Sequence, residues 1–232
     1  MAKLLLKDKL AAQRIYLILA GLFIASLVVS NLIFQKFFSW DFFGFYTFEI
    51  SVGILPYPVT FLITDIISEI YGKKKANQVV TTGIFASFFS LLIIYTADAV
   101  PATEWSPIGD VLFTQVFGAT TIAVFASMVA YLLAQYIDIH LFHFWKRLTK
   151  GKHLWLRNNF STFLSQFVDT FSVLFLLCSF NKIEWDLFGA LLLSGFLFKV
   201  IVAALDTPLL YASVFAFRKR FKLKQGEELK YD

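Results

Sequence analysis

Residues 15–36 read IYLILAGLFIASLVVSNLIFQK, and no charged side chain interrupts them before the final lysine. About 20 apolar residues in a helix, at 1.5 Å per residue, cross the roughly 30 Å hydrocarbon core of a bilayer. Similar runs follow at about 50–71, 77–97, 111–137, 158–180 and 187–216. The sequence therefore predicts an all-α integral membrane protein, with six transmembrane helices in a single domain covering residues 1–232.

The composition excludes an ordinary soluble protein. Hydrophobic residues make up 58% of the chain and charged residues only 16%, against roughly 45–50% and about 25% in soluble domains. The single cysteine, Cys178, excludes an intrachain disulfide. The net charge of +5 is divided among four short basic clusters, at 3–14, 73–75, 146–157 and 218–230, and nucleic acid is therefore not an expected partner.

The basic clusters alternate with segments that are acidic or nearly neutral. Loops rich in Lys and Arg remain on the cytoplasmic side of a membrane. The alternation therefore predicts that the chain crosses six times and that both termini are cytoplasmic.

The second apolar segment is irregular, because Pro56 and Pro58 interrupt it. One interpretation is a broken element, irregular through residues 53–57, followed by a half-helix that begins at Pro58, where its missing N–H costs nothing. The alternative is a continuous helix with a proline kink. Irregular backbone at membrane depth is tolerated only beside a cavity or packed protein, so the first interpretation places residues 53–57 beside one or the other.

Several polar side chains lie within the predicted spans or at their edges, where ionisable groups are costly and mark functional sites. The candidates for binding a substrate are Asp65, Glu69, Asn159, Gln166, Asp169, Lys199 and Asp206. Asp65 and Glu69 are four residues apart and share a helix face. The alternatives are purely structural roles: interfacial positions for Glu69 and Asp206, and an ion pair between Asp169 and Lys199 that only joins two helices.

Motifs of common enzymes are absent from the sequence. It contains no GxxxxGK[ST] phosphate loop, no HExxH and no GxSxG, and its three histidines lack a complete metal-ligand set. We therefore expect no enzyme, cofactor or metal site. The polar and aromatic residues suit a planar, nitrogen-rich solute. Acids accept from its N–H groups, Gln and Asn bind both edges of an amide, and aromatic side chains stack on a flat ring.

The stretch PYPVTFLITDIISEIYG (56–72) resembles the hallmark of the queuosine precursor transporter (VUT) family. Arg157-Asn158-Asn159 followed by Ser165-Gln166 and Asp169-Thr170 is similar to its second signature. Lys199 with Asp206-Thr207-Pro208 is similar to its last. The resemblance extends over essentially the whole chain and includes the order of the motifs.

The resemblance implies a bacterial inner-membrane importer of 7-cyano- or 7-aminomethyl-7-deazaguanine, or of queuine, for queuosine salvage in tRNA. It also implies a fold similar to the membrane subunits of energy-coupling-factor vitamin transporters. The short matches between Thr60-Phe61-Leu62 and Thr162-Phe163-Leu164 are compatible with two three-helix repeats. A homo-oligomer is compatible with this architecture.

The hypothesis assigns the guanidine-like edge of the base to Asp65 or Asp169, and the carbonyl edge to Gln166 and Asn159. Lys199 would balance charge, while Glu69 and Asp206 would gate the site or carry protons. Two alternatives remain open at this point. One is a substrate-binding subunit of an ATP-driven vitamin-type importer, and the other is a non-transporting membrane scaffold or enzyme.

Overall fold

Helices dominate the computed structural model, which describes residues 6–34, 36–118, 121–181 and 183–229. Lys3, Lys182 and Lys230, part of the predicted charge pattern, lie outside this part. The helices are α1 Leu6–Ile33, α2 Tyr57–Ile70, α3 Lys73–Asp98, α4 Asp110–Phe113, α5 Thr121–Leu148, α6 Leu154–Ser179 and α7 Trp185–Phe221. Among the described residues, five helical segments are long and apolar enough to cross a membrane: Leu6–Ile33, Val52–Ile70, Lys73–Asp98, Leu154–Ser179 and Trp185–Phe221. The helical membrane class is thus confirmed.

The predicted span at 111–137 differs from the structure at both ends. Its start is divided between the short α4 and a π-helical turn, Thr114–Gly118, and α5 then begins at Thr121. Residues 119–120 lie outside the described part. At the other end α5 continues to Leu148. The apolar run stops at Asp138, but that side chain is buried against α2 and α6, so the helix does not end there.

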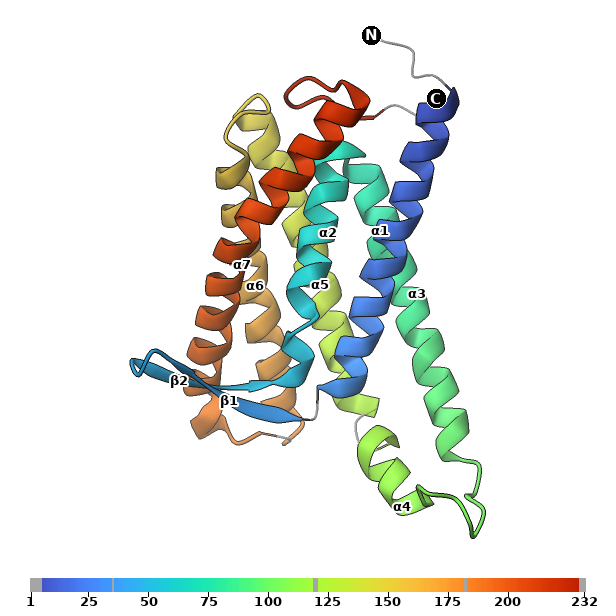
Figure 1. Cartoon of the computed structure of the whole chain (residues 1–232). Helices are drawn as coiled ribbons and strands as arrows, with labels where there is room; N and C mark the ends of the chain where they lie inside the picture. The colour runs from blue at the N-terminus through green and yellow to red at the C-terminus, as the bar shows by residue number, and fades with distance from the viewer. Residues whose placement is uncertain (1–5, 35, 119–120, 182, 230–232) are drawn as a thin grey trace.

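The long helices surround α2, which lies at the centre of the bundle (Figure 1). Successive neighbours pack around it, α1 on α3, α3 on α5, α5 on α6 and α6 on α7, while α2 contacts α1, α3, α5 and α7. The hydrophobic core lies along α2, where Ile67 and Ile70 are completely buried. Most of the remaining large apolar side chains point outward, as lipid-facing residues do.

A β-hairpin lies between α1 and α2 and was not predicted. Its strands, β1 Phe37–Phe42 and β2 Tyr46–Ser51, pair antiparallel and cross one end of α7 (Figure 1). Phe48 and Ile50 of β2 are buried against Phe198 of α7. Tyr46 and Ser194 form a hydrogen bond between their hydroxyls. The hairpin therefore joins the start of α2 to α7.

The second segment is broken, as the first interpretation predicts. A 3₁₀ turn, Val52–Ile54, and a turn at Leu55 and Pro56 precede α2, whose first turn contains Pro58. The predicted segment 50–71 thus consists of the 3₁₀ turn and α2, and Pro56 lies between them. Gly53 sits where the 3₁₀ turn touches α1, and a Cβ there would lie 2.7 Å from the Ser30 carbonyl oxygen.

The start of α1 and the end of α7 lie at the same end of the bundle (Figure 1). An ion pair of 2.9 Å between Asp8 Oδ1 and Arg220 Nη1 joins them. Basic residues from two of the clusters, Lys146, Arg157 and Arg218, gather at this end around one acid, Glu69. The start of α1, the end of α7 and these basic residues therefore lie at one end of the bundle.

Candidate functional site

A column of polar side chains occupies the middle of the bundle. On α2 the buried polar residues are Thr60, Thr64, Asp65, Ser68 and Glu69, and on α6 they are Arg157, Asn158, Ser161, Thr162, Ser165, Gln166, Asp169 and Thr170. Their spacings of three and four residues place them on one face of each helix. Buried polar groups require partners, so the two stripes face the interior rather than lipid.

Part of this column borders a cavity between α2, α6 and α7. The lining residues are Tyr57, Pro58, Phe61, Leu62, Asp65, Asn158, Thr162, Gln166, Lys199, Ala203 and Asp206. Two carboxyl groups, two amides, an ammonium and two aromatic rings thus meet around one space. The free volume is about 20 Å³, enough for about one water molecule. This space is therefore too small to hold a ring-sized solute.

One wall of the cavity contains an ion pair between neighbouring helices. Lys199 Nζ on α7 lies 2.5 Å from Asp169 Oδ2 on α6, and both side chains are largely buried. The same ammonium lies 4.6 Å from the centre of the Tyr57 ring on α2, within the range of a cation–π interaction. Lys199 therefore holds three helices together where the cavity begins.

The structure brings four of the predicted residues to the cavity, namely Asp65, Gln166, Lys199 and Asp206. Asp169 adjoins it through Lys199. Asn159 points elsewhere, because its amide donates to the Trp155 carbonyl and to the Thr207 hydroxyl.

Its neighbour Asn158 lines the cavity instead. Sequence reasoning placed Asn158 at the polar start of this helix but gave it no role in binding. Consecutive helical residues point about 100° apart, so a shift of one position decides which amide faces the site.

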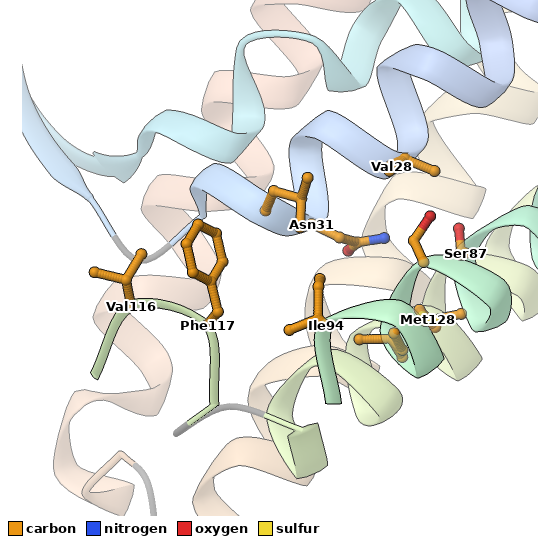
Figure 2. A pocket seen from close by; sticks show the side chains of 10 residues that line it. Val28, Asn31, Ser87, Ile94, Val116, Phe117 and Met128 are labelled. Carbon is orange, nitrogen blue, oxygen red and sulfur yellow. The ribbon is translucent and has the colours of Figure 1, made fainter. Parts of the chain in front are cut away.

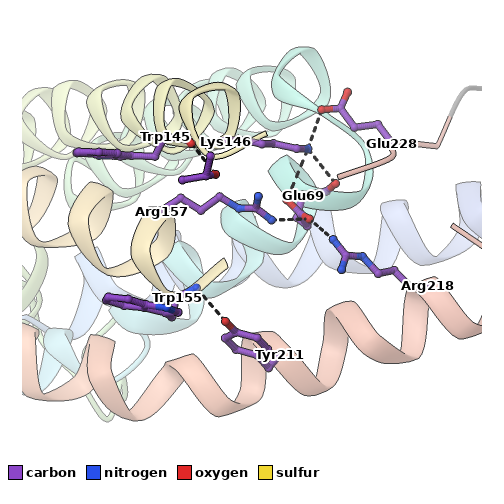
Figure 3. Close-up of polar contacts among 9 residues, drawn as sticks. Glu69, Trp145, Lys146, Trp155, Arg157, Tyr211, Arg218 and Glu228 are labelled. Atoms are coloured by element: carbon purple, nitrogen blue, oxygen red, sulfur yellow. Dashed lines mark hydrogen bonds and ion pairs between the residues drawn. The ribbon is translucent and has the colours of Figure 1, made fainter. Parts of the chain in front are cut away.

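Glu69 lies away from the cavity in a cluster of charges (Figure 3). One of its carboxylate oxygens, Oε1, lies 2.7 Å from Arg157 Nη2 and 2.5 Å from Arg218 Nη2. Lys146 Nζ lies 3.5 Å from the other oxygen. Glu69 and Arg157 are both completely buried. The cluster ties α2, α5, α6 and α7 together at the end of the bundle that carries the basic residues.

The segment after α7 packs on the same cluster. Glu228 Oε1 accepts from Lys146 Nζ at 2.8 Å, and the Leu229 N–H donates to the Ile70 carbonyl at 2.7 Å. A Cβ on Gly72, whose φ is +84°, would meet the Glu228 carboxylate at 2.4 Å. The glycine that ends the 56–72 motif thus allows this segment to cover the end of α2.

Three buried polar residues of α5 were missed by sequence reasoning. Gln135 accepts from the Thr64 hydroxyl at 3.2 Å and donates to the Tyr131 hydroxyl at 2.7 Å. Asp138 accepts from the Ser165 hydroxyl at 3.0 Å. The helical spacing of Tyr131, Gln135 and Asp138 could have revealed this stripe, but Asp138 was taken to lie beyond the span.

A second cavity lies between α1, α3, the π-helical turn and α5 (Figure 2). Its polar liners include Asn31 and Ser87, whose Nδ2 and Oγ atoms are buried without a partner among the described residues. The other labelled liners are apolar, and none of its described liners is charged. It contains none of the predicted site residues, so the first cavity is the better candidate for a polar solute.

Comparisons with known proteins agree with the motifs. A family model described as "Putative vitamin uptake transporter" matches residues 51–213. The chain is 27% identical over 165 residues to the "Probable queuosine precursor transporter" of Bacillus subtilis (strain 168), which covers 70% of this chain and 71% of the relative. No solved structure matches.

A second relative is the "Queuosine precursor transporter" of Escherichia coli (strain K12), 30% identical over 135 residues. That match covers 57% of this chain, which spans little more than half the length of the relative, 56%. The family model extends from the last residue of the hairpin through most of α7 and includes every residue that lines the cavity. The chain therefore belongs to the queuosine precursor transporter (VUT) family.

Proposed function

We propose that this chain imports queuosine precursors across the bacterial inner membrane, with 7-cyano- or 7-aminomethyl-7-deazaguanine, or queuine, as the substrate. Membership of a transporter family separates the chain from enzymes. The observation that carries the proposal is the cavity itself. Two carboxyl groups, two amides and an ammonium from three helices face one space there, beside two aromatic rings.

The chemistry of the lining residues matches the edge of a deazaguanine. A carboxylate accepts two hydrogen bonds in parallel, which suits the ring N–H and the 2-amino group of the base. Asp65 is the buried carboxyl on the cavity wall, and its Oδ1 has no partner among the described residues. Gln166 Oε1 is likewise buried and without a partner there. Asn158 is placed to donate to the base carbonyl, and the ring of Tyr57 or Phe61 provides a stacking face.

The small size of the cavity has a consequence for transport. A purine-sized base needs more room than one water molecule, so α2 and α7 must separate for it to enter. Lys199 is the side chain that touches both helices α2 and α6 from α7, so its contacts are expected to change when the site opens. Contraction and opening of one central site is the behaviour expected of an alternating-access carrier.

The test is uptake in bacteria that cannot make the base and that lack their own transporter, read out as queuosine in tRNA. The unaltered chain should restore queuosine when 7-cyano- or 7-aminomethyl-7-deazaguanine is supplied. Asp65→Asn should abolish this uptake, because the amide presents an N–H where the base also has one. Normal transport by both Asp65→Asn and Asp169→Asn would refute the site. Purified chain that binds the base but does not transport it in liposomes would favour a subunit of an ATP-driven importer.

A further inference from the structure

A second buried carboxyl group lies directly behind the cavity. Asp138 of α5 is completely buried, and its carboxyl contacts that of Asp65 at hydrogen-bonding range. The contact follows from the packing of α2 on α5, because Thr64, next to Asp65, bonds to Gln135, one turn before Asp138. Asp65 itself is only 2% exposed.

Among the described residues, neither carboxyl group forms an ion pair, and Arg157 is the cation that faces Asp65. Asp65 Oδ1 and Asp138 Oδ2 are buried and lack a donor among the described residues. The other oxygen of Asp138, Oδ1, accepts from the Ser165 hydroxyl, and the hydroxyls of Ser161 and Thr162 also face this carboxyl group.

Two such carboxyl groups cannot both be charged. The repulsion between unit charges about 4 Å apart is about 4 kcal/mol even at an effective dielectric constant near 20. Burial adds a penalty of several kcal/mol for each unpaired ion. A single proton between facing oxygens removes both costs, as in other buried carboxyl pairs.

From this geometry we propose that Asp65 and Asp138 share one proton and form the proton site of a proton-coupled importer. The inference rests on the proposed function and adds the coupling ion to it. When the N–H groups of the base bind Asp65, that carboxyl must be the acceptor, so the shared proton moves to Asp138. The loaded site then holds the base and one proton together. When the base leaves, the pair can release the proton on the same side.

Two of the other buried acids are held by cations, which leaves the pair and Asp206 as the carboxyl groups near the cavity without an ion pair among the described residues. Glu69 of α2 is held by Lys146, Arg157 and Arg218, and Asp169 of α6 is held by Lys199. The further titratable groups that face the pair are Asp206 on α7, Arg157 on α6 and Tyr131 on α5. From α1 and α3, the buried side chains packed in the core around α2 are apolar, among them Phe23, Leu27, Val79 and Val80.

The experiment uses the purified full chain in liposomes with radiolabelled 7-cyano-7-deazaguanine and the membrane potential clamped at zero. Counterflow at equal pH measures binding and translocation alone. A pH gradient of one unit, acidic outside, measures coupling. With one proton per base, the unaltered chain should accumulate the base about tenfold, and adding base without a gradient should make the outer medium more alkaline.

Asp138→Asn should keep counterflow within about twofold of the unaltered chain and lose the tenfold accumulation, because the amide cannot hold the shared proton. Asp138→Glu should keep accumulation. The matched control is Asp186→Asn, which changes an exposed acid at the start of α7.

Retained accumulation by Asp138→Asn would overturn the inference. Counterflow without gradient-driven accumulation or proton uptake by the unaltered chain would overturn it too, while leaving the proposed function intact. Absence of counterflow in the unaltered chain would refute the proposed function and the inference with it. Proton uptake by the unaltered chain decides the question even where a variant does not fold.

Discussion

Arg157 Nη2 on α6 lies 2.7 Å from Glu69 Oε1 on α2, and neither side chain is exposed to solvent. The motif that contains Glu69 and the motif that contains Arg157 are thus joined by a direct ion pair, although 88 positions separate them in the sequence. Because Arg218 and Lys146 reach the same carboxylate, a single acid balances cations from three helices. Such a centre joins the helices at the end of the bundle that carries the basic residues, away from the cavity.

Replacing Glu69 by Ala should therefore destabilise the fold. The change leaves buried Arg157 without a counter-ion, at a cost of about 3–5 kcal/mol. Thermal unfolding of the purified protein in detergent measures the effect. Arg220→Ala is the control, because its pair with Asp8 is largely exposed and is worth about 0–1 kcal/mol. Equal stability of the two variants would contradict the structural role of Glu69.

Adjacent asparagines should differ in their effect on transport. Asn158→Ala removes an amide from the cavity wall and should raise the KM for the base about tenfold, the cost of about one or two lost hydrogen bonds. Asn159→Ala removes bonds to Trp155 and Thr207 outside the cavity and should leave KM within about twofold. Uptake kinetics in liposomes measure both. A larger effect from Asn159→Ala would indicate that α6 is rotated in the working protein.

The ion pair of Asp169 and Lys199 allows packing to be separated from binding. Lys199→Met should destabilise the protein by about 3–5 kcal/mol, because Asp169 remains buried and unpaired. Adding Asp169→Asn should restore much of the stability, since no lone charge is left. Uptake should stay impaired, because Lys199 lines the cavity. Restored uptake in the double variant would show that the pair is purely structural and takes no part in binding.

Gly53→Ala should lower the stability of the bundle. The added Cβ would lie 2.7 Å from the Ser30 carbonyl oxygen and 2.8 Å from Phe34 Cβ, so α1 and the 3₁₀ turn must move apart. The cost of such overpacking is about 1–3 kcal/mol, and the melting temperature should fall by several degrees. Gly189→Ala is the matched control, because no atom lies within 4 Å of its added Cβ. A stable Gly53→Ala protein would show that this contact is looser than described.

The pattern of apolar runs predicted most of the fold, because the bilayer restricts spans to helices of a set length. The cost of charged and polar groups in hydrocarbon pointed to Asp65, Gln166, Lys199 and Asp206, which the structure places around one cavity. It could not separate Glu69 from this group, since its cationic partners come from helices far away in the sequence.

Other features depended on tertiary contacts that no local pattern specifies. The hairpin residues 37–51 are rich in aromatic side chains and were indistinguishable from the flank of an apolar span until Phe48 was seen packed on Phe198. Asp138 has the charge of a helix-terminal residue, yet its partners on α2 and α6 bury it. In both cases packing decided the structure against the local signal.

The hairpin is continuous with the first turn of α2 through the 3₁₀ turn and rests on α7 through Phe48 and Phe198. It therefore connects α2 and α7, two walls of the cavity, at one end of the bundle. Those walls can part widely there only if the aromatic contact breaks. Opening of the cavity at this end therefore requires that Phe48 separate from Phe198 and that the hydrogen bond between Tyr46 and Ser194 break.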